Sequence, residues 1–234
     1  MPIAGRRLGG SVARFFAELE SMERARWRRG ARSGGRGARR ILDADYASRA
    51  REVQKADMRA GGEIVYIAVG ANLGDREATF AAVIRALKEE GEWLILAASS
   101  IYETPPLGPA GQPPYLNAVV ALRAWLSPID LLRRLQAIED GLGRNRGPDA
   151  VRWGPRLIDL DVLFYGDRCI DLPDLVVPHP AAHERAFVMT PLAELAPTLC
   201  HPVLGVAVSD IADGLPGRDE VRVWQRPEGW PGAA

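Results

Sequence analysis

Two aspartates one residue apart lie in an otherwise apolar stretch, and their spacing could support metal chemistry. Residues 152–165 read RWGPRLIDLDVLFY, which contains Asp159 and Asp161. Successive side chains of a strand point to opposite faces, so the two carboxylates share one face and the aliphatic residues around them share the other. The Cα atoms of such a pair are roughly 6.5 to 7 Å apart. The carboxylates can therefore converge on one or two Mg²⁺ ions spaced roughly 3.5 to 4 Å apart.

Four arginines precede the aspartates in a polar loop that reads GLGRNRGPDAVRWGPR. Arginine is permanently charged, and its fork of donors suits phosphate oxygens. Carboxylates for a metal beside arginines for phosphate indicate phosphoryl transfer, in which catalysis is largely positioning and charge neutralisation. An Asp-x-Asp pair alone can equally be two solvated aspartates on a half-exposed strand. The interpretation therefore depends on the loop residues Arg144, Arg146, Arg152 and Arg156.

Strands and helices alternate around this loop. Hydrophobic periodicity predicts strands at residues 63–72, 93–104, 115–125 and 158–165, and helices from Asp75 to about Glu90 and from Ser127 to about Glu139. A short hairpin at 169–178 and helices near 187–195 and 206–212 follow. The order β-α-β, β-α-β is typical of an α+β ferredoxin-like sandwich, in which helices pack on one face of a mainly antiparallel sheet.

Charge divides the chain, although its formal net charge over 234 residues is zero. Residues 1–62 hold fifteen Arg and Lys against seven Asp and Glu, and include the tract RWRRGARSGGRGARR. Such a tract buries too little apolar surface to offset its ordering entropy, so we expect a disordered or loosely helical extension. We therefore divide the chain into this basic extension (1–62), a folded domain (63–217) and a C-terminal tail (218–234).

Three roles are open for the basic extension. It could bind nucleic acid or a membrane surface, it could be an Arg-rich targeting segment, or the true start could lie near Met58. No run of eighteen or more apolar residues predicts a membrane-spanning helix, and Cys169 and Cys200 lack the spacing of a zinc site or a disulfide framework. We expect a cytoplasmic monomer without a membrane partner, and without a nucleic-acid partner except through the extension.

Three motifs in the chain resemble, in the right order, the 6-hydroxymethyl-7,8-dihydropterin pyrophosphokinase family of folate biosynthesis. They read YETPPLGPAGQPPYLNAVV, RWGPRLIDLDVL and VPHPAAHERAFVMTPL, and the match runs from about Val65 to Leu215. The resemblance implies a ferredoxin-like fold and an ATP-dependent diphosphokinase. Such an enzyme moves the βγ-pyrophosphate of ATP onto the hydroxymethyl group of the pterin and releases AMP. The implied small-molecule partners are ATP, two Mg²⁺ ions and the pterin.

The same resemblance assigns a phosphate site. It implies that Asp159 and Asp161 hold the two Mg²⁺ ions, and that Arg144 and Arg156 contact the transferred group. The further ATP-binding residues that it implies are Glu139, Arg146, Arg152, His179 and Arg185.

Two of these assignments keep an alternative. Glu139 could instead be an exposed carboxylate at the end of its helix. The family often has an aromatic residue directly after the histidine that matches His179, or a basic residue five positions before it. This chain has Pro180 and Asp174 at those positions. The contacts to the triphosphate on that side are therefore open.

A pterin site is also implied by the resemblance. The pterin would stack between Tyr115 and Phe187, and the amide of Asn117 would read its polar edge. A Pro-Pro loop holds its carbonyl groups rigidly, with little entropy left to lose, and suits the floor of a pocket. The implied pterin-binding residues are Thr104, Pro105, Pro106, Leu107, Tyr115, Asn117 and Phe187, with Asn72 in the VGANLG turn as a further candidate.

Two other classes of protein use parts of this pattern. A nucleotidyltransferase or nuclease on a related sandwich also has a strand-borne aspartate pair with two metals, but the rigid PPLGP loop and the stacking pair favour a small planar substrate. An RNA-binding module would carry exposed aromatic residues with basic neighbours on its sheet, whereas this sheet carries acids. AMP release that depends on hydroxymethyl-dihydropterin would separate the three classes.

Overall fold

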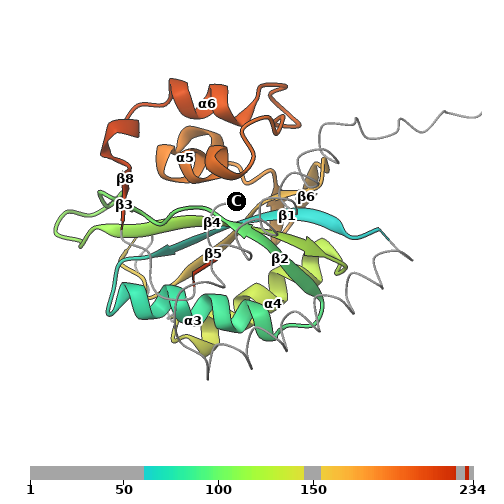
Figure 1. Cartoon of the computed structure of the whole chain (residues 1–234), viewed down its shortest axis with the longest axis horizontal. Coiled ribbons are helices and arrows are strands. Elements are labelled where there is room, and N and C mark those ends of the chain that lie inside the picture. Colours follow the sequence, from blue (N-terminus) through green and yellow to red (C-terminus); the bar gives the residue numbers. More distant parts are fainter. Residues whose placement is uncertain (1–60, 145–153, 225–229, 232–234) are drawn as a thin grey trace, which may run out of the picture. The chain divides into compact units, whose positions relative to one another are not determined.

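A computed structural model of the chain describes residues 61–144, 154–224 and 230–231 (Figure 1). The predictions for residues 1–60, and for Arg146 and Arg152, lie outside these residues. The strands are β1 (Glu63–Ala71), β2 (Trp93–Ala98), β3 (Tyr102–Thr104), β4 (Tyr115–Ala124), β5 (Asp159–Tyr165), β6 (Ile170–Leu172), β7 (Leu175–Val177) and β8 (Arg222–Val223). The helices are α3 (Arg76–Glu89), α4 (Pro128–Gly141), α5 (Ala186–Leu195) and α6 (Val208–Gly214), with the short 3-10 helices η1 (Ala182–Glu184) and η2 (Arg218–Glu220).

The main sheet runs in the order β5-β1-β4-β3-β8, and β2 also pairs with β4. Strand β1 is antiparallel to both β4 and β5. The segment predicted as one strand at 93–104 forms two strands that pair with successive stretches of β4. Between them, Ser99 donates its N–H to the carbonyl of Val119 (2.9 Å) and accepts the N–H of Val119 on its hydroxyl (3.0 Å). The hydroxyl of Ser99 thus replaces a backbone carbonyl as the acceptor at this point of the ladder, and the strand is interrupted between β2 and β3.

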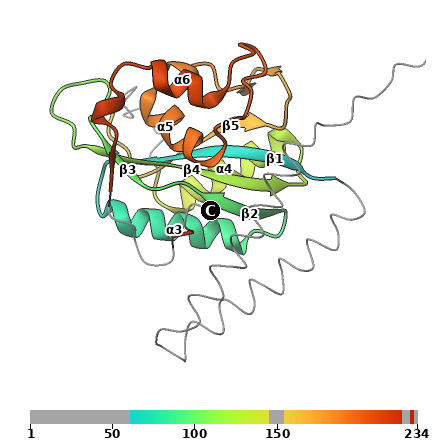
Figure 2. The same cartoon turned by 45° about the horizontal axis from the view of Figure 1, so that its top comes forward.

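Helices cover both faces of the main sheet (Figures 1 and 2). Helices α3 and α4 pack on one face, and α5 and α6 lie on the other. The expectation that the helices pack on one face is therefore wrong for α5 and α6. The physical reason lies in β4, where Val119 and Val120 are both fully buried although they point to opposite faces. A sheet that is apolar on both sides must be covered on both sides.

Helices α3 and α4 begin where the sequence predicts them. The side chain of Asp75 accepts the N–H of Ala78 at 2.9 Å, and that of Ser127 accepts the N–H of Asp130 at 3.2 Å. These caps satisfy donors that the first helical turn leaves unpaired. The buried face of α3 consists of Phe80, Val83, Ile84 and Leu87, as its periodicity predicts. In the part of the chain that the structure describes, no helix combines the length and the apolarity needed to cross a membrane.

Part of the segment predicted as a C-terminal tail packs on the fold. Strand β8 pairs with β3, and the indole of Trp230 is 7% exposed. The indole N–H of Trp230 donates to the carbonyl of Ser99 at 2.8 Å, and its ring centroid lies 5.3 Å from that of Phe80. The C-terminal segment therefore contributes Trp230 to the hydrophobic core, in contact with α3.

We expect Trp230→Ala to lower the free energy of unfolding by about 3 to 5 kcal/mol, because it removes a large buried ring and a buried hydrogen bond. Urea unfolding measures this difference. Val203 is 67% exposed, so Val203→Ala is a matched control that should change stability by less than about 0.5 kcal/mol. An equally small change for Trp230→Ala would show that this segment does not stabilise the fold.

Candidate active site

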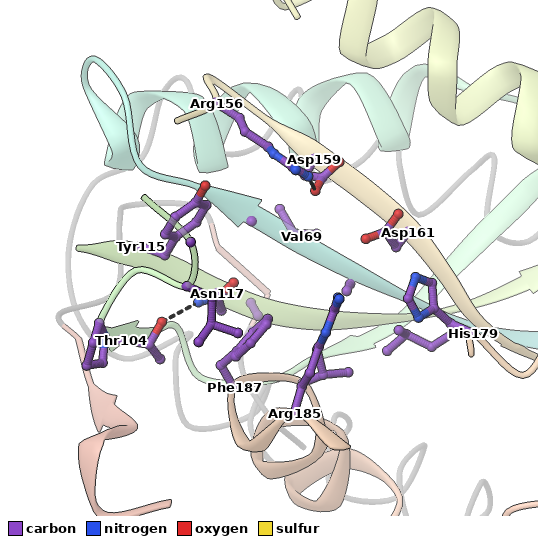
Figure 3. Close-up of a pocket in the computed structure, with 18 residues that line it drawn as sticks. Val69, Thr104, Tyr115, Asn117, Arg156, Asp159, Asp161, His179, Arg185 and Phe187 are labelled. Carbon is purple, nitrogen blue, oxygen red and sulfur yellow. Dashed lines mark hydrogen bonds and ion pairs between the residues drawn. The ribbon is translucent and has the colours of Figure 1, made fainter. Parts of the chain in front are cut away.

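A pocket of about 340 Å³ lies between the main sheet and the start of α5 (Figure 3). Its walls come from β1, β4 and β5, from the loop that joins β3 to β4, and from the segment around η1 and α5. This volume is within the range of small-molecule sites. The predicted residues that line the pocket are Thr104, Pro105, Leu107, Tyr115, Asn117, Arg156, Asp159, Asp161, His179, Arg185 and Phe187.

Strand β5 presents its two aspartates to this pocket. Leu160 lies between them and is 3% exposed, facing the core on the opposite side. The neighbouring strand β1 places Gly70 opposite Asp159 and Ala68 opposite Asp161. Two residues with almost no side chain therefore border the carboxylates, and the space above them stays open for a ligand.

Asp159 forms ion pairs with two of the predicted arginines. Arg144 Nη1 lies 2.9 Å from its Oδ1, and Arg156 Nη1 donates to its Oδ2. Arg144 also donates to the carbonyl of Ile158, one residue earlier. All three charged side chains are less than one quarter exposed. Two guanidinium groups are thus held at Asp159, one from Arg156, which lines the pocket, and one from Arg144, which does not. An incoming phosphate could compete with Asp159 for them.

The negative charge of Asp161 is unfavourable in the folded protein. Burial raises the pKa of the Asp161 carboxyl above its ordinary value, and the neighbouring charge of Asp159 raises it further. His179, Arg156 and Arg185 act in the opposite direction and lower this pKa. These three groups and the two aspartates all line the pocket. We call this set the charged end of the pocket: Asp159, Asp161, Arg156, His179 and Arg185. A cation bound there would relieve the repulsion between the two aspartates.

The aspartate pair suits one kind of metal site. Among the described residues, no group of three or more His, Cys, Asp or Glu side chains could hold a metal ion. Zinc in structural sites needs four protein ligands. Mg²⁺ instead commonly binds through one or two carboxylates, with the remaining positions filled by waters and substrate phosphates. The donor set therefore fits Mg²⁺ in company with a phosphorylated substrate.

The other half of the pocket is aromatic and hydrogen bonding, and we call it the aromatic end: Thr104, Tyr115, Asn117 and Phe187 (Figure 3). Asn117 Nδ2 donates to Thr104 Oγ1 at 2.7 Å, which fixes the orientation of the amide. A Cβ atom added at Gly70 would lie 3.2 Å from Asn117 Oδ1. Glycine at this position therefore keeps the floor clear beside the amide oxygen.

Two side chains join the ends of the pocket. The hydroxyl of Tyr115 donates to the carbonyl of Gly154 at 3.2 Å, which ties the aromatic end to the segment that carries Arg156. The Arg185 guanidinium carbon lies 5.9 Å from the centroid of the Phe187 ring. A ligand spanning the pocket would thus meet an aromatic surface first and a cationic one next.

Asn72 supports the pocket from outside its lining. It is 2% exposed, its Oδ1 accepts the N–H of Arg156 at 2.7 Å, and its Nδ2 donates to the carbonyl of Pro113 at 3.2 Å. Pro106 likewise is not among the lining residues. Asn72 therefore connects the proline-rich loop to the segment that precedes β5 and its aspartates.

Glu139 lies behind β5 and is 3% exposed. Its Oε1 accepts the N–H of Leu160 at 2.8 Å, between the two aspartates. The alternative of an exposed carboxylate at the helix end is wrong, because the end of α4 packs against β5. Glu139 thus fixes the backbone between Asp159 and Asp161.

The position of α5 depends on a carboxylate that the sequence interpretation missed. Glu194 accepts bonds from the N–H of Ser100 (2.8 Å), the hydroxyl of Ser100 (3.0 Å) and the hydroxyl of Tyr102 (2.8 Å). These bonds hold α5, with Phe187 on its first turn, over the sheet. No local signal could have revealed them, since Ser100 and Glu194 are 94 residues apart.

Comparison with known proteins gives the same family by sequence. The sequence model described as 7,8-dihydro-6-hydroxymethylpterin-pyrophosphokinase (HPPK) matches residues 66–197, more than half of the chain. A Pseudomonas aeruginosa protein described as 2-amino-4-hydroxy-6-hydroxymethyldihydropteridine pyrophosphokinase is 47% identical over 138 residues, which are 59% of this chain and 83% of that protein. A Bacillus subtilis protein with the same description is 41% identical over 166 residues, which are 71% of this chain and 93% of that protein.

Comparison with solved structures concerns the fold. The Plasmodium falciparum HPPK-DHPS A437G protein, solved with STZ-DHP, is similar with a TM-score of 0.52 at 14% identity. The similarity covers 66% of this chain and 46% of that chain. The chain thus spans less than half of that solved protein, and the likeness shows the fold alone.

We expect opposite effects on stability from the two aspartates. The folded state raises the pKa of Asp161 above its ordinary 3.8, so the native protein binds more protons than the unfolded chain between the two values. Stability therefore falls as pH rises through that window, and the penalty persists at neutral pH. Asp161→Asn removes this penalty and should raise Tm at pH 7.

Asp159→Asn leaves two guanidinium groups without their carboxylate and should lower the free energy of unfolding by about 1 to 3 kcal/mol.

Thermal melts in EDTA, at pH 7 and near pH 4, measure both effects. The stabilisation by Asp161→Asn should shrink at the lower pH, where Asp161 of the unmodified protein is increasingly protonated. A lower Tm for Asp161→Asn at pH 7 would contradict the electrostatic description of the charged end.

Proposed function

The chain belongs to the 7,8-dihydro-6-hydroxymethylpterin-pyrophosphokinase family, and from this premise we propose how its pocket divides the work of the reaction. The enzyme transfers pyrophosphate from ATP to the hydroxymethyl group of 6-hydroxymethyl-7,8-dihydropterin and releases AMP, in folate biosynthesis. One observation carries the proposal: a single pocket has an aromatic end suited to a flat ring and a charged end suited to phosphates.

The charged end receives the triphosphate of ATP. Asp159 and Asp161 hold two Mg²⁺ ions, which when bound neutralise phosphate charge and polarise the phosphoryl oxygens. ATP carries about four negative charges that must be balanced without blocking in-line attack on the β-phosphorus. The cationic side chains supply this balance from several directions. They are Arg144, Arg156, His179 and Arg185, together with Arg146 and Arg152, which are proposed from the sequence resemblance alone.

Arg144 and Arg156 act on the transferred group itself. Both form ion pairs with Asp159, so phosphate oxygens that enter the charged end compete with that carboxylate for the same guanidinium groups. As the bond to the leaving AMP breaks, charge grows on the phosphate oxygens, and a fixed guanidinium stabilises this charge more than that of the ground state. Glu139 contributes to the nucleotide site indirectly, by holding the N–H of Leu160 and with it the spacing of the aspartates.

The aromatic end receives the pterin. Tyr115 and Phe187 offer ring faces for stacking, and the amide of Asn117, oriented by Thr104, reads the polar edge of the ring. Thr104, Pro105 and Leu107 form one wall, with Pro106 behind the lining, and Asn72 holds the adjoining loop in place. With the ring at the aromatic end, the hydroxymethyl group would point toward the aspartates and the β-phosphorus of the ATP bound beside them.

The wider architecture supports four further proposals. The strand order β5-β1-β4-β2, with α3 and α4 on one face, is the arrangement of a ferredoxin-like sandwich. Residues 63–217 contain every group assigned to the reaction, and the basic extension (1–62) is dispensable for it. The enzyme acts as a monomer without a nucleic-acid partner. It resides in the cytoplasm, which the free and exposed Cys169 and Cys200 support, because such thiols persist in a reducing compartment.

Asp159→Asn and Asp161→Asn should each reduce AMP release by at least about a hundredfold, because each removes a ligand charge from the metal site. The assay measures AMP from ATP and Mg²⁺, with and without hydroxymethyl-dihydropterin. The unmodified enzyme should release AMP only with the pterin present. Activity near that of the unmodified enzyme in either variant would contradict the metal assignment, and AMP release without the pterin would contradict the substrate assignment.

Substitutions at the two ends of the pocket should change different kinetic parameters. Arg144→Ala and Arg156→Ala should lower kcat by about tenfold or more with little change in pterin affinity, because their charge matters most as the phosphate bond breaks. Phe187→Ala should raise the KM for the pterin and leave the KM for ATP nearly unchanged. Arg134→Ala is the control. Arg134 does not line the pocket and forms an ion pair with Glu90, with 3.5 Å between Nη1 and Oε2. The reverse pattern, in which the arginine variants weaken pterin binding and spare kcat, would overturn the division.

A further inference from the structure

The loop of residues 105–114 contributes one wall of the pocket and makes few hydrogen bonds of its own. Pro105, Leu107 and Gly108 line the pocket from this loop. Five of its ten residues are prolines, which have no N–H to donate. Most of the loop is exposed, and the pocket-lining side chain of Leu107 is 60% exposed. The position of this wall therefore depends in part on contacts from outside the loop, such as those of Asn72 with Gln112 and Pro113.

One arginine contacts both ends of the loop. Arg76, the first residue of α3, places its Nη1 atom 3.0 Å from Glu103 Oε1 and 2.9 Å from the carbonyl oxygen of Pro114. Glu103 directly precedes Thr104, and Pro114 directly precedes Tyr115. The same guanidinium group thus spans the mouth of the loop, one residue away from two members of the aromatic end.

The C-terminal segment covers this arginine. The Arg76 guanidinium carbon lies 5.2 Å from the centroid of the Trp224 ring, a cation–π arrangement. The indole N–H of Trp224 donates to Glu77 Oε1 at 2.8 Å, and its backbone N–H donates to the carbonyl of Ile101 at 2.8 Å. Trp224 is held at both its ring and its backbone, so its ring restrains the guanidinium group of Arg76. It also lies outside residues 66–197, which the family model matches.

We propose that Arg76, restrained by Trp224, is a positioning residue for the pterin substrate. It does not line the pocket. Its two bonds join the start and the end of loop 105–114 next to the β3–β4 ladder, in which Thr104 pairs with Tyr115. They thereby help to position Thr104, which orients Asn117, and the ring of Tyr115. This inference rests on the proposed function, because it assigns the aromatic end to the pterin. Small displacements of groups that hold a substrate are costly, and here the loss should fall on pterin affinity rather than on phosphoryl transfer.

The test compares Arg76→Met, which keeps most of the stem but loses every polar contact, with Arg76→Lys, which keeps the charge. Steady-state kinetics give kcat and the KM values for ATP and the pterin, and calorimetric titration with the pterin gives its Kd. Arg76→Met should raise the pterin Kd and KM about tenfold, as expected for the loss of hydrogen bonds made by a charged group. Its kcat and its KM for ATP should stay within about twofold. Arg76→Lys should restore part of the pterin affinity.

Two further variants separate positioning from stability. Trp224→Ala should raise the pterin KM less than Arg76→Met, and Trp224→Phe, which keeps a ring over the guanidinium, should stay near the unmodified enzyme. Arg134→Met is the control for loss of a surface arginine. An unchanged pterin KM in Arg76→Met and Trp224→Ala would overturn the inference, and so would a fall in kcat that matches a lower Tm without a selective effect on the pterin. If Arg76→Met does not fold, Arg76→Lys and Trp224→Ala decide by the same criterion.

The outcome also distinguishes this inference from the function on which it rests. If the unmodified enzyme releases no AMP in the presence of the pterin, the proposed function fails. If the unmodified enzyme is active and the variants keep its pterin affinity, only the role of Arg76 and Trp224 fails.

Discussion

The repulsion between two neighbouring carboxylates organises this active site. Asp159 and Asp161 point to the same side of β5, and burial together with mutual repulsion raises the pKa of Asp161. The fold compensates by placing Arg144 and Arg156 on one carboxylate and His179 and Arg185 near the other. Under the proposed function this arrangement trades stability for metal and phosphate binding, because Mg²⁺ and ATP would neutralise the charges that destabilise each other in the protein.

Each layer of the fold fixes one part of this arrangement. Below the sheet, α4 supplies Glu139, which holds the backbone between the aspartates. Within the sheet, Gly70 on β1 leaves the carboxylates accessible. Above the sheet, Glu194 anchors α5 and with it Phe187. Because these constraints come from three different layers, the positions of the aromatic and charged ends are set by the packing of the whole domain, and Arg76 adds a fourth constraint at the proline-rich loop.

The sequence predicted those features that follow from local pattern. The alternation around Asp159 indicated one polar and one buried face, and the caps and apolar spacing of α3 and α4 predicted both helices. The features that it did not predict are contacts between distant segments. Glu139 resembled an exposed helix end because only tertiary packing buries it, and Gly70 gave no signal because its partner Asp159 is assigned by strand register. Trp224 resembled part of a tail because its contacts lie on residues more than a hundred positions earlier.

The most direct test of this account is a crystal structure with the pterin, Mn²⁺ in place of Mg²⁺, and an ATP analogue in which a methylene group replaces the oxygen between the α- and β-phosphates. The bond that the reaction breaks then stays intact. The account predicts two manganese ions, located by anomalous scattering, that contact both Asp159 and Asp161, with the pterin ring between Tyr115 and Phe187 and the guanidinium groups of Arg144 and Arg156 on phosphate oxygens. Metal bound away from the aspartates, or a pterin ring outside the aromatic end, would contradict it.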